Sequence, residues 1–95
     1  MKVVFSRLAL AELDDILAYL KPRSPKGAEN VEARLKRVIQ LIAEQPHASQ
    51  QLAARKGIRR APLVHYPYVI YYKVTETEVT ILRIRHGARR ALWNR

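Results

Sequence analysis

Apolar residues recur at helical spacing in the first half of the chain. After the β-branched and aromatic run 3–5 comes Ser6, which suits a helix N-cap because its hydroxyl can accept from an otherwise unpaired backbone N–H. The next apolar positions recur at helical spacing up to Pro22, with acidic residues on the other side: Leu10, Leu13, Ile16, Leu17 and Leu20. The pattern predicts a short strand followed by an amphipathic helix of about four turns.

A second helix is predicted between Ser24 and Pro46. Ser24 is a candidate N-cap, and Pro25 suits the first helical position, where its missing N–H costs nothing. The apolar residues of this segment again follow a helical period: Ala28, Val31, Leu35, Val38, Ile39 and Ile42. Because the link between the two helices is short, we expect them to pack antiparallel as a hairpin.

The second half of the chain has the pattern of strands. Residues 46–56 show no clean period and are predicted to form a loop. Beyond it, the ranges 58–63, 68–74 and 79–85 are rich in β-branched and aromatic residues and are separated by short breaks, which predicts a three-stranded meander. Strict alternation in the last range predicts Thr80, Leu82 and Ile84 on one face and Val79, Ile81, Arg83 and Arg85 on the other.

The order β-α-α-β-β-β predicts an α+β domain in which the helical hairpin covers one face of an antiparallel sheet. A length of 95 residues with 48% hydrophobic content suits a single domain over residues 1–95, ending in a basic tail at 86–95. With no cysteine, neither a disulfide framework nor a thiolate metal site is available. No secretory or membrane-spanning segment is recognisable, so we expect a cytoplasmic protein that makes no use of a membrane.

Positive charge is concentrated in the second half of the chain. The net charge is +10; residues 1–45 hold eight Lys and Arg against six Asp and Glu, whereas residues 46–95 hold ten against two. A surface of this sign favours anionic partners, such as nucleic acid, a ribonucleoprotein or an acidic protein. Solubility alone is the other interpretation of the charge.

The candidate chemistry lies in a few basic side chains. Arg59, Arg83 and Arg85 could hold a phosphate, and His86 could transfer a proton, because histidine is a common general acid or base. A structural role is open for two of them: His86 could cap the last strand, and Arg83 could pair with carbonyls or an acid. The isolated glycines form no phosphate loop and the acids lack metal-ligand spacing, so we expect no cofactor and no metal.

Several segments resemble the ParE/RelE toxin superfamily. The segments at 57–60 (GIRR), 68–74 (YVIYYKV) and 79–89 (VTILRIRHGAR) are similar to its carboxy-terminal half, and Phe5-Ser6 with the helix over 9–20 is similar to its first strand and helix. The resemblance covers nearly the whole chain. Its most specific part is the Ile-Leu-Arg-x-x-His-Gly-x-Arg ending at 81–89, which resembles the ParE branch rather than the RelE branch.

This resemblance implies the toxin of a type II toxin–antitoxin, or plasmid stabilisation, module that is neutralised by a small cognate antitoxin. The ParE branch is associated with inhibition of DNA gyrase, and the RelE branch with cleavage of mRNA on the ribosome. Our expectation is a gyrase inhibitor that acts by direct binding rather than as an enzyme. The alternatives are a ribosome-dependent endoribonuclease and a non-toxic basic nucleic-acid-binding module.

Each expectation has its own residues. An inhibitor would bind its target through the end of the last strand and the tail, where arginine and an aromatic residue gather: Arg83, Arg85, His86, Arg89, Arg90, Trp93 and Arg95. An endoribonuclease would use Arg59, Arg83, Arg85 and His86, although the lysine cluster and terminal tyrosine of RelE-like nucleases have no counterpart here. Leu20 and Leu41, as apolar residues left over on the hairpin, are the expected antitoxin contacts.

Overall fold

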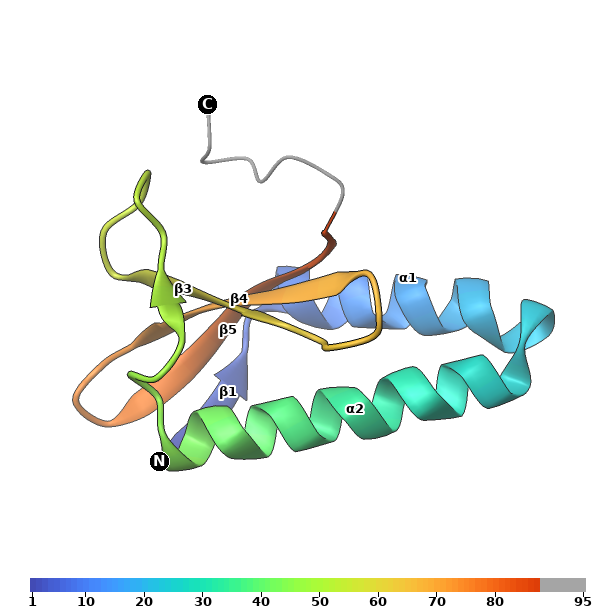
Figure 1. The fold of residues 1–95 in the computed structure, drawn as a ribbon, viewed down its shortest axis with the longest axis horizontal. Coiled ribbons are helices and arrows are strands. Elements are labelled where there is room, and N and C mark those ends of the chain that lie inside the picture. The colour runs from blue at the N-terminus through green and yellow to red at the C-terminus, as the bar shows by residue number, and fades with distance from the viewer. Residues whose placement is uncertain (88–95) are drawn as a thin grey trace.

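Two antiparallel helices lie along one side of a twisted sheet (Figure 1). The structure is a computed structural model and describes residues 1–87. Along the chain its elements are β1 (Lys2–Phe5), α1 (Arg7–Arg23), α2 (Pro25–Glu44), β2 (Gln50–Gln51), β3 (Ile58–Pro62), β4 (Tyr68–Val74) and β5 (Glu78–His86). The predicted α+β class and the order of its main elements are confirmed, and β2 is an additional short strand within the predicted loop.

The sheet has the strand order β1-β5-β4-β3-β2. The antiparallel pairing of β3, β4 and β5 confirms the predicted three-stranded meander, and β2 adds a further antiparallel pair. The prediction of a wholly antiparallel sheet is wrong, because β1 runs parallel to β5 and makes the sheet mixed. Parallel neighbours need a long connection. Here the connection is nearly the whole chain, because β1 and β5 are the first and last elements described.

The helical hairpin is joined by a single residue, Ser24. Its backbone N–H donates to the Leu20 carbonyl at 2.7 Å and closes α1, while its Oγ accepts from the Gly27 N–H at 3.0 Å and caps α2. Pro25 occupies the start of α2, as predicted, and α1 ends one residue beyond Pro22. With one residue between them, the helices can only turn back on each other. Neither helix of residues 1–87 is long and apolar enough to cross a membrane.

The core lies between the helices and the sheet. Its buried members come from α1, α2, the strands β3, β4 and β5, and the residue that follows β3: Ala9, Val31, Leu35, Ile42, Ala61, Leu63, Ile70, Tyr72, Val79, Ile81 and Ile84. Tyr72 is fully buried, and its hydroxyl donates to the Pro46 carbonyl at 2.8 Å. The hydroxyl therefore ties the segment after α2 to the middle of the sheet.

A β-bulge in β5 changes which residues face the helices. Tyr72 pairs with Ile81 but Tyr71 pairs with Arg83, so Leu82 is an extra residue in β5. The predicted strict alternation over 79–85 is therefore wrong: Val79 and Ile81 belong to the same core as Ile84.

The bulge leaves the two β5 arginines on the face opposite the helices, as predicted. Arg83 and Arg85 pair with Tyr71 and Val69, which form a second cluster separate from the main core. Leu52 and Ile58 pack against that cluster, so the segment around β2 covers part of this face. The face opposite the helices is only partly open.

We expect Tyr72→Phe to lower the free energy of unfolding by about 1 kcal/mol, because it removes a hydrogen bond to a partly buried carbonyl. Urea unfolding measures the difference. Tyr19→Phe is the matched control: that side chain is 58% exposed, and its loss of a hydroxyl should change stability by less than about 0.5 kcal/mol. Equal effects of the two variants would contradict the role assigned to the Tyr72 hydroxyl.

Candidate functional site

One edge of β5 has no neighbouring strand in its second half. The pairing with β1 ends at Phe5 and Ile81, and the chain then turns away into α1. Ser6 marks the turn. Its backbone N–H donates to the Ile81 carbonyl at 2.9 Å, and its Oγ accepts from the Ala9 N–H at 3.0 Å, as predicted for an N-cap, and donates to the Leu82 carbonyl at 2.9 Å.

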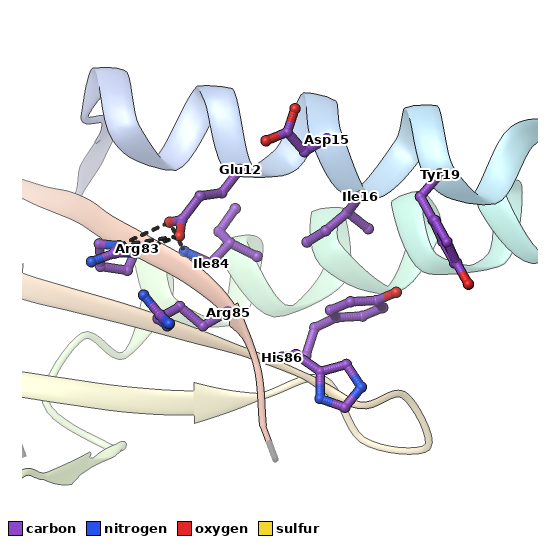
Figure 2. A pocket seen from close by; sticks show the side chains of 9 residues that line it. Glu12, Asp15, Ile16, Tyr19, Arg83, Ile84, Arg85 and His86 are labelled. Carbon is purple, nitrogen blue, oxygen red and sulfur yellow. Dashed lines mark hydrogen bonds and ion pairs between the residues drawn. The ribbon is translucent and has the colours of Figure 1, made fainter. Parts of the chain in front are cut away.

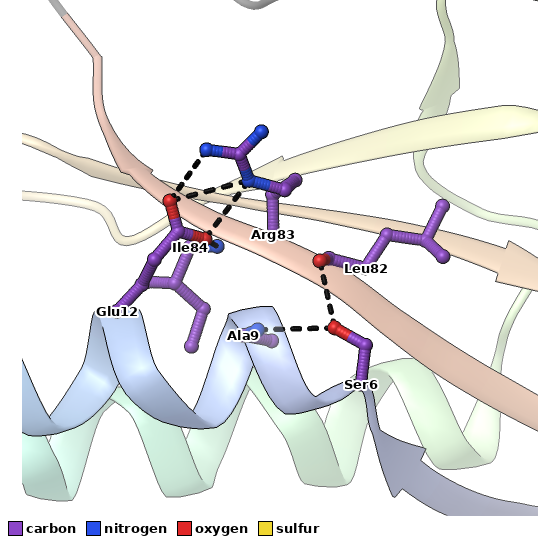
Figure 3. A network of polar contacts seen from close by, with 6 residues as sticks. All are labelled: Ser6, Ala9, Glu12, Leu82, Arg83 and Ile84. Carbon is purple, nitrogen blue, oxygen red and sulfur yellow. Dashed lines mark hydrogen bonds and ion pairs between the residues drawn. The ribbon is translucent and has the colours of Figure 1, made fainter.

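Glu12 of α1 continues the contact with this edge (Figure 3). Its Oε1 accepts from the Ile84 backbone N–H at 2.9 Å. Its two carboxylate oxygens also accept from Arg83 Nε at 3.1 and 3.2 Å, and Oε2 accepts from Arg83 Nη2 at 2.8 Å. One carboxylate therefore accepts a hydrogen bond from an N–H at the unpaired edge of β5 and also neutralises the charge of Arg83.

Arg83 is consequently part of the framework. The residue is 7% exposed, and its guanidinium is held in a bidentate pair with Glu12. This geometry matches the structural role considered for Arg83 from the sequence, pairing with an acid. It leaves little of the side chain for a target or a phosphate.

Beyond Glu12, a groove of about 640 Å³ opens between α1 and the end of β5 (Figure 2). Its walls come from three elements and combine both signs of charge with aromatic rings: Glu12, Asp15, Ile16, Tyr19, Tyr68, Arg83, Ile84, Arg85 and His86. We call it the α1–β5 groove. Tyr68 and His86 meet edge to face inside it, with ring centroids 5.9 Å apart and planes at 81°.

Arg85 is the unusual member of the α1–β5 groove. Its Nε is buried and has no hydrogen-bond partner within residues 1–87. A buried donor without an acceptor is unfavourable, and native structures keep few of them. A carboxylate or carbonyl oxygen brought to this atom would remove the cost.

Arg59 does not join the other residues of the predicted nuclease set. Its Nη1 donates to the His47 and Ser49 carbonyls at 3.1 and 2.6 Å, which holds the segment before β2 in place. Arg59 pairs in register with Tyr72 of the core, whereas Arg85 pairs with Val69 on the opposite face of the sheet. Of that set, Arg83, Arg85 and His86 line the α1–β5 groove together, and Arg83 is held there by its ion pair with Glu12.

Sequence reasoning missed two features of this region. Arg60, rather than Arg59, shares the face of Arg85, because it pairs with Tyr71; it makes no side-chain hydrogen bond or ion pair within the described chain. Asp15 and Tyr19 line the α1–β5 groove. The signal for them was available, since Glu12, Asp15 and Tyr19 recur at the spacing of a single helix face.

The remaining candidates occupy other places. Leu41 is 45% exposed on α2, whereas Leu20 is partly buried against the core. The tail candidates lie outside the described residues: Arg89, Arg90, Trp93 and Arg95. Within residues 1–87, no group of three or more His, Asp and Glu side chains is placed to hold a metal ion.

Comparison with known proteins gives concordant results. The profile of the family described as the ParE toxin of the type II toxin–antitoxin system, parDE, matches residues 3–91. Toxin RelE2 of Caulobacter vibrioides is 39% identical over 88 residues, which cover 93% of this chain and 97% of that protein. Putative toxin Y4kP of Sinorhizobium fredii is 36% identical over 79 residues, covering 83% and 80%.

A solved structure has the same fold. The chromosomal ParDE TA system from P. aeruginosa contains a chain that superposes with a TM-score of 0.78 and 22% sequence identity. The match covers 90% of the present chain and 95% of the other. The helical hairpin and the sheet are thus a known arrangement.

We expect Glu12→Gln to lower the free energy of unfolding by about 3 kcal/mol, because Arg83 would remain buried without its counter-charge. Urea unfolding measures the loss. Asp15→Asn, one turn further along α1 and exposed, is the control and should change stability by less than about 0.5 kcal/mol.

A double variant separates the ion pair from packing. Glu12→Gln combined with Arg83→Met removes both charges, so it should recover part of the stability lost in Glu12→Gln alone. A Glu12→Gln loss no larger than that of Asp15→Asn would show that the pair contributes little.

Proposed function

The chain belongs to the family of ParE toxins of type II toxin–antitoxin systems, and on this premise we propose that it inhibits DNA gyrase by direct binding and is neutralised by a cognate antitoxin. Such a protein acts in the cytoplasm, and the module that encodes it would stabilise a plasmid or a chromosomal segment. The α1–β5 groove and the basic residues that follow it would form the target-binding surface.

Arg85 is the observation that supports this surface most directly. Its buried Nε has no acceptor within residues 1–87, so a partner that supplied an oxygen to this guanidinium would be favoured. His86 and the exposed ring of Tyr19 border the same groove, and aromatic and arginine residues are the side chains that dominate binding energy in interfaces. The tail residues Arg89, Arg90, Trp93 and Arg95 extend the proposal beyond the described chain.

The separation of the basic candidates favours binding over catalysis. Cleavage of RNA requires several groups around one phosphate, to take a proton and to stabilise charge. Here Arg59 is bonded to a loop on the other face of the sheet and Arg83 is paired with Glu12.

A ribosome-dependent endoribonuclease is the second candidate. Arg85, His86 and Tyr68 line one groove, which brings a cation, an imidazole and a phenol together. The relative named toxin RelE2 supports the same candidate.

The antitoxin would bind the helical hairpin at Leu41. This side chain is large, apolar and 45% exposed, and a helix or strand of a partner could bury it. Leu20, the other candidate, already packs against the core and offers less surface. The similarity of fold to a chain of a ParDE toxin–antitoxin system supports the expectation of such a partner.

The purified protein should inhibit supercoiling by gyrase and leave ribosome-bound mRNA intact. Arg85→Gln should raise the inhibitory concentration about tenfold, the effect of losing one charge-assisted hydrogen bond. Arg7→Gln is the control, because Arg7 is exposed on α1 and does not line the groove. Cleavage of mRNA without inhibition of supercoiling would reject the gyrase-inhibitor proposal in favour of the endoribonuclease.

Leu41→Asp should weaken binding of the cognate antitoxin about tenfold or more, because a charge replaces an apolar contact, and should leave gyrase inhibition unchanged. Calorimetric titration of the toxin with the antitoxin measures the affinity. Gln40→Asp is the control: it introduces an aspartate at the neighbouring exposed position of α2 and should leave the affinity for the antitoxin unchanged. Equal losses in both variants would assign the effect to charge on α2 rather than to Leu41.

A further inference from the structure

A second groove lies on α2 beside the turn between β3 and β4, which Figure 1 shows close to this helix. Its volume is about 300 Å³, and it is lined by Asn30, Ala33, Arg34, Arg37 and Tyr66. We call it the α2 notch. It shares no residue with the α1–β5 groove, and its walls contain no carboxylate.

The two arginines of the α2 notch have no acidic partner among the described residues. Arg34 and Arg37 stand one turn apart on α2, so both can reach the same space. Within residues 1–87 neither makes a side-chain hydrogen bond or an ion pair, whereas Lys26 on the same helix pairs with Glu29 at 3.6 Å. Arg34 is also partly buried, which strengthens its interaction with any anion that enters.

A strained turn brings Tyr66 to the α2 notch. The Tyr66 N–H donates to the Leu63 carbonyl at 2.8 Å, and between them His65 has φ of 76°, in the left-handed region that favours glycine. Such strain costs about 1 kcal/mol or more and is concentrated at binding and active sites. The ring of Tyr66 packs against the core, and no hydrogen bond of its hydroxyl is formed within the described chain.

From these observations we infer that the α2 notch binds a phosphate group. The residues that line it carry two guanidinium groups, an amide and a phenol, which together offer more donors than the two oxygens of one carboxylate can accept well. Arg, Asn and Tyr side chains are among those that contact nucleic-acid phosphates. Free phosphate and the backbone of a nucleic acid share this chemistry, and the net charge of +10 attracts both.

The test is a titration followed by NMR, with inorganic phosphate in one arm and a short DNA duplex in the other. Saturable shifts are expected at the side-chain Nε–Hε signals of Arg34 and Arg37 and at the Tyr66 amide. Saturation by inorganic phosphate identifies a site for an isolated phosphate group, and saturation by the duplex alone identifies a site for the nucleic-acid backbone. Absence of shifts at these positions in both arms overturns the inference.

Matched double variants separate the notch from general charge. Arg34→Gln with Arg37→Gln should weaken binding in the responding arm about tenfold or more, equivalent to about 1.4 kcal/mol. Lys26→Gln with Lys36→Gln removes the same charge from the same helix but leaves the α2 notch intact. This control should weaken binding in the same arm no more than about twofold.

Two results would reject the α2 notch as a phosphate site. Equal weakening in both double variants would show that binding follows net charge, and competition by a glutamate-rich peptide as strong as that by phosphate would show a site for carboxylates. Thermal unfolding of both double variants verifies that they are folded. Arg34→Lys keeps the charge but loses the planar guanidinium, so its affinity should lie between that of the original chain and that of the Arg34→Gln, Arg37→Gln double variant.

Discussion

The carboxylate of Glu12 is the contact on which the architecture of this toxin depends. It accepts hydrogen bonds from the Arg83 guanidinium and from the Ile84 N–H, and so joins α1 to the part of β5 that β1 does not reach. Without it, a strand edge would be unpaired and a buried cation would lack its anion, both of which are costly. The position of α1 set by this contact also defines one wall of the α1–β5 groove.

The arginines of this chain divide into those that build the fold and those that remain for partners. Arg83 and Arg59 are bound to the protein's own carboxylate and carbonyls, so their charge and donors serve the framework. Among residues 1–87, Arg85 Nε at the α1–β5 groove has no acceptor, and Arg34 and Arg37 at the α2 notch have no acidic partner. The net charge of +10 is therefore larger than the positive charge that a partner can contact, and the location of the arginines matters more than their number.

Local signals in the sequence predicted the helices well. The features that depend on pairing between distant segments could not be predicted from such signals. Ser6 and Ser24 cap the helices as predicted, because a cap depends on a few neighbouring residues. The choice between Arg59 and Arg60 for the face of Arg85 depends on strand register, and a shift of one residue exchanges the faces. The pairing of Glu12 with Arg83 joins positions 71 residues apart, which no local pattern specifies.

The parallel pairing of β1 with β5 has a consequence for the synthesis of the protein. The first strand of the chain finds its partner only when the last one has been made, so a ribosome must release almost the entire domain before the sheet can close. Contacts between such distant segments also slow folding. A toxin of this design therefore completes its sheet only after β5 has left the ribosome.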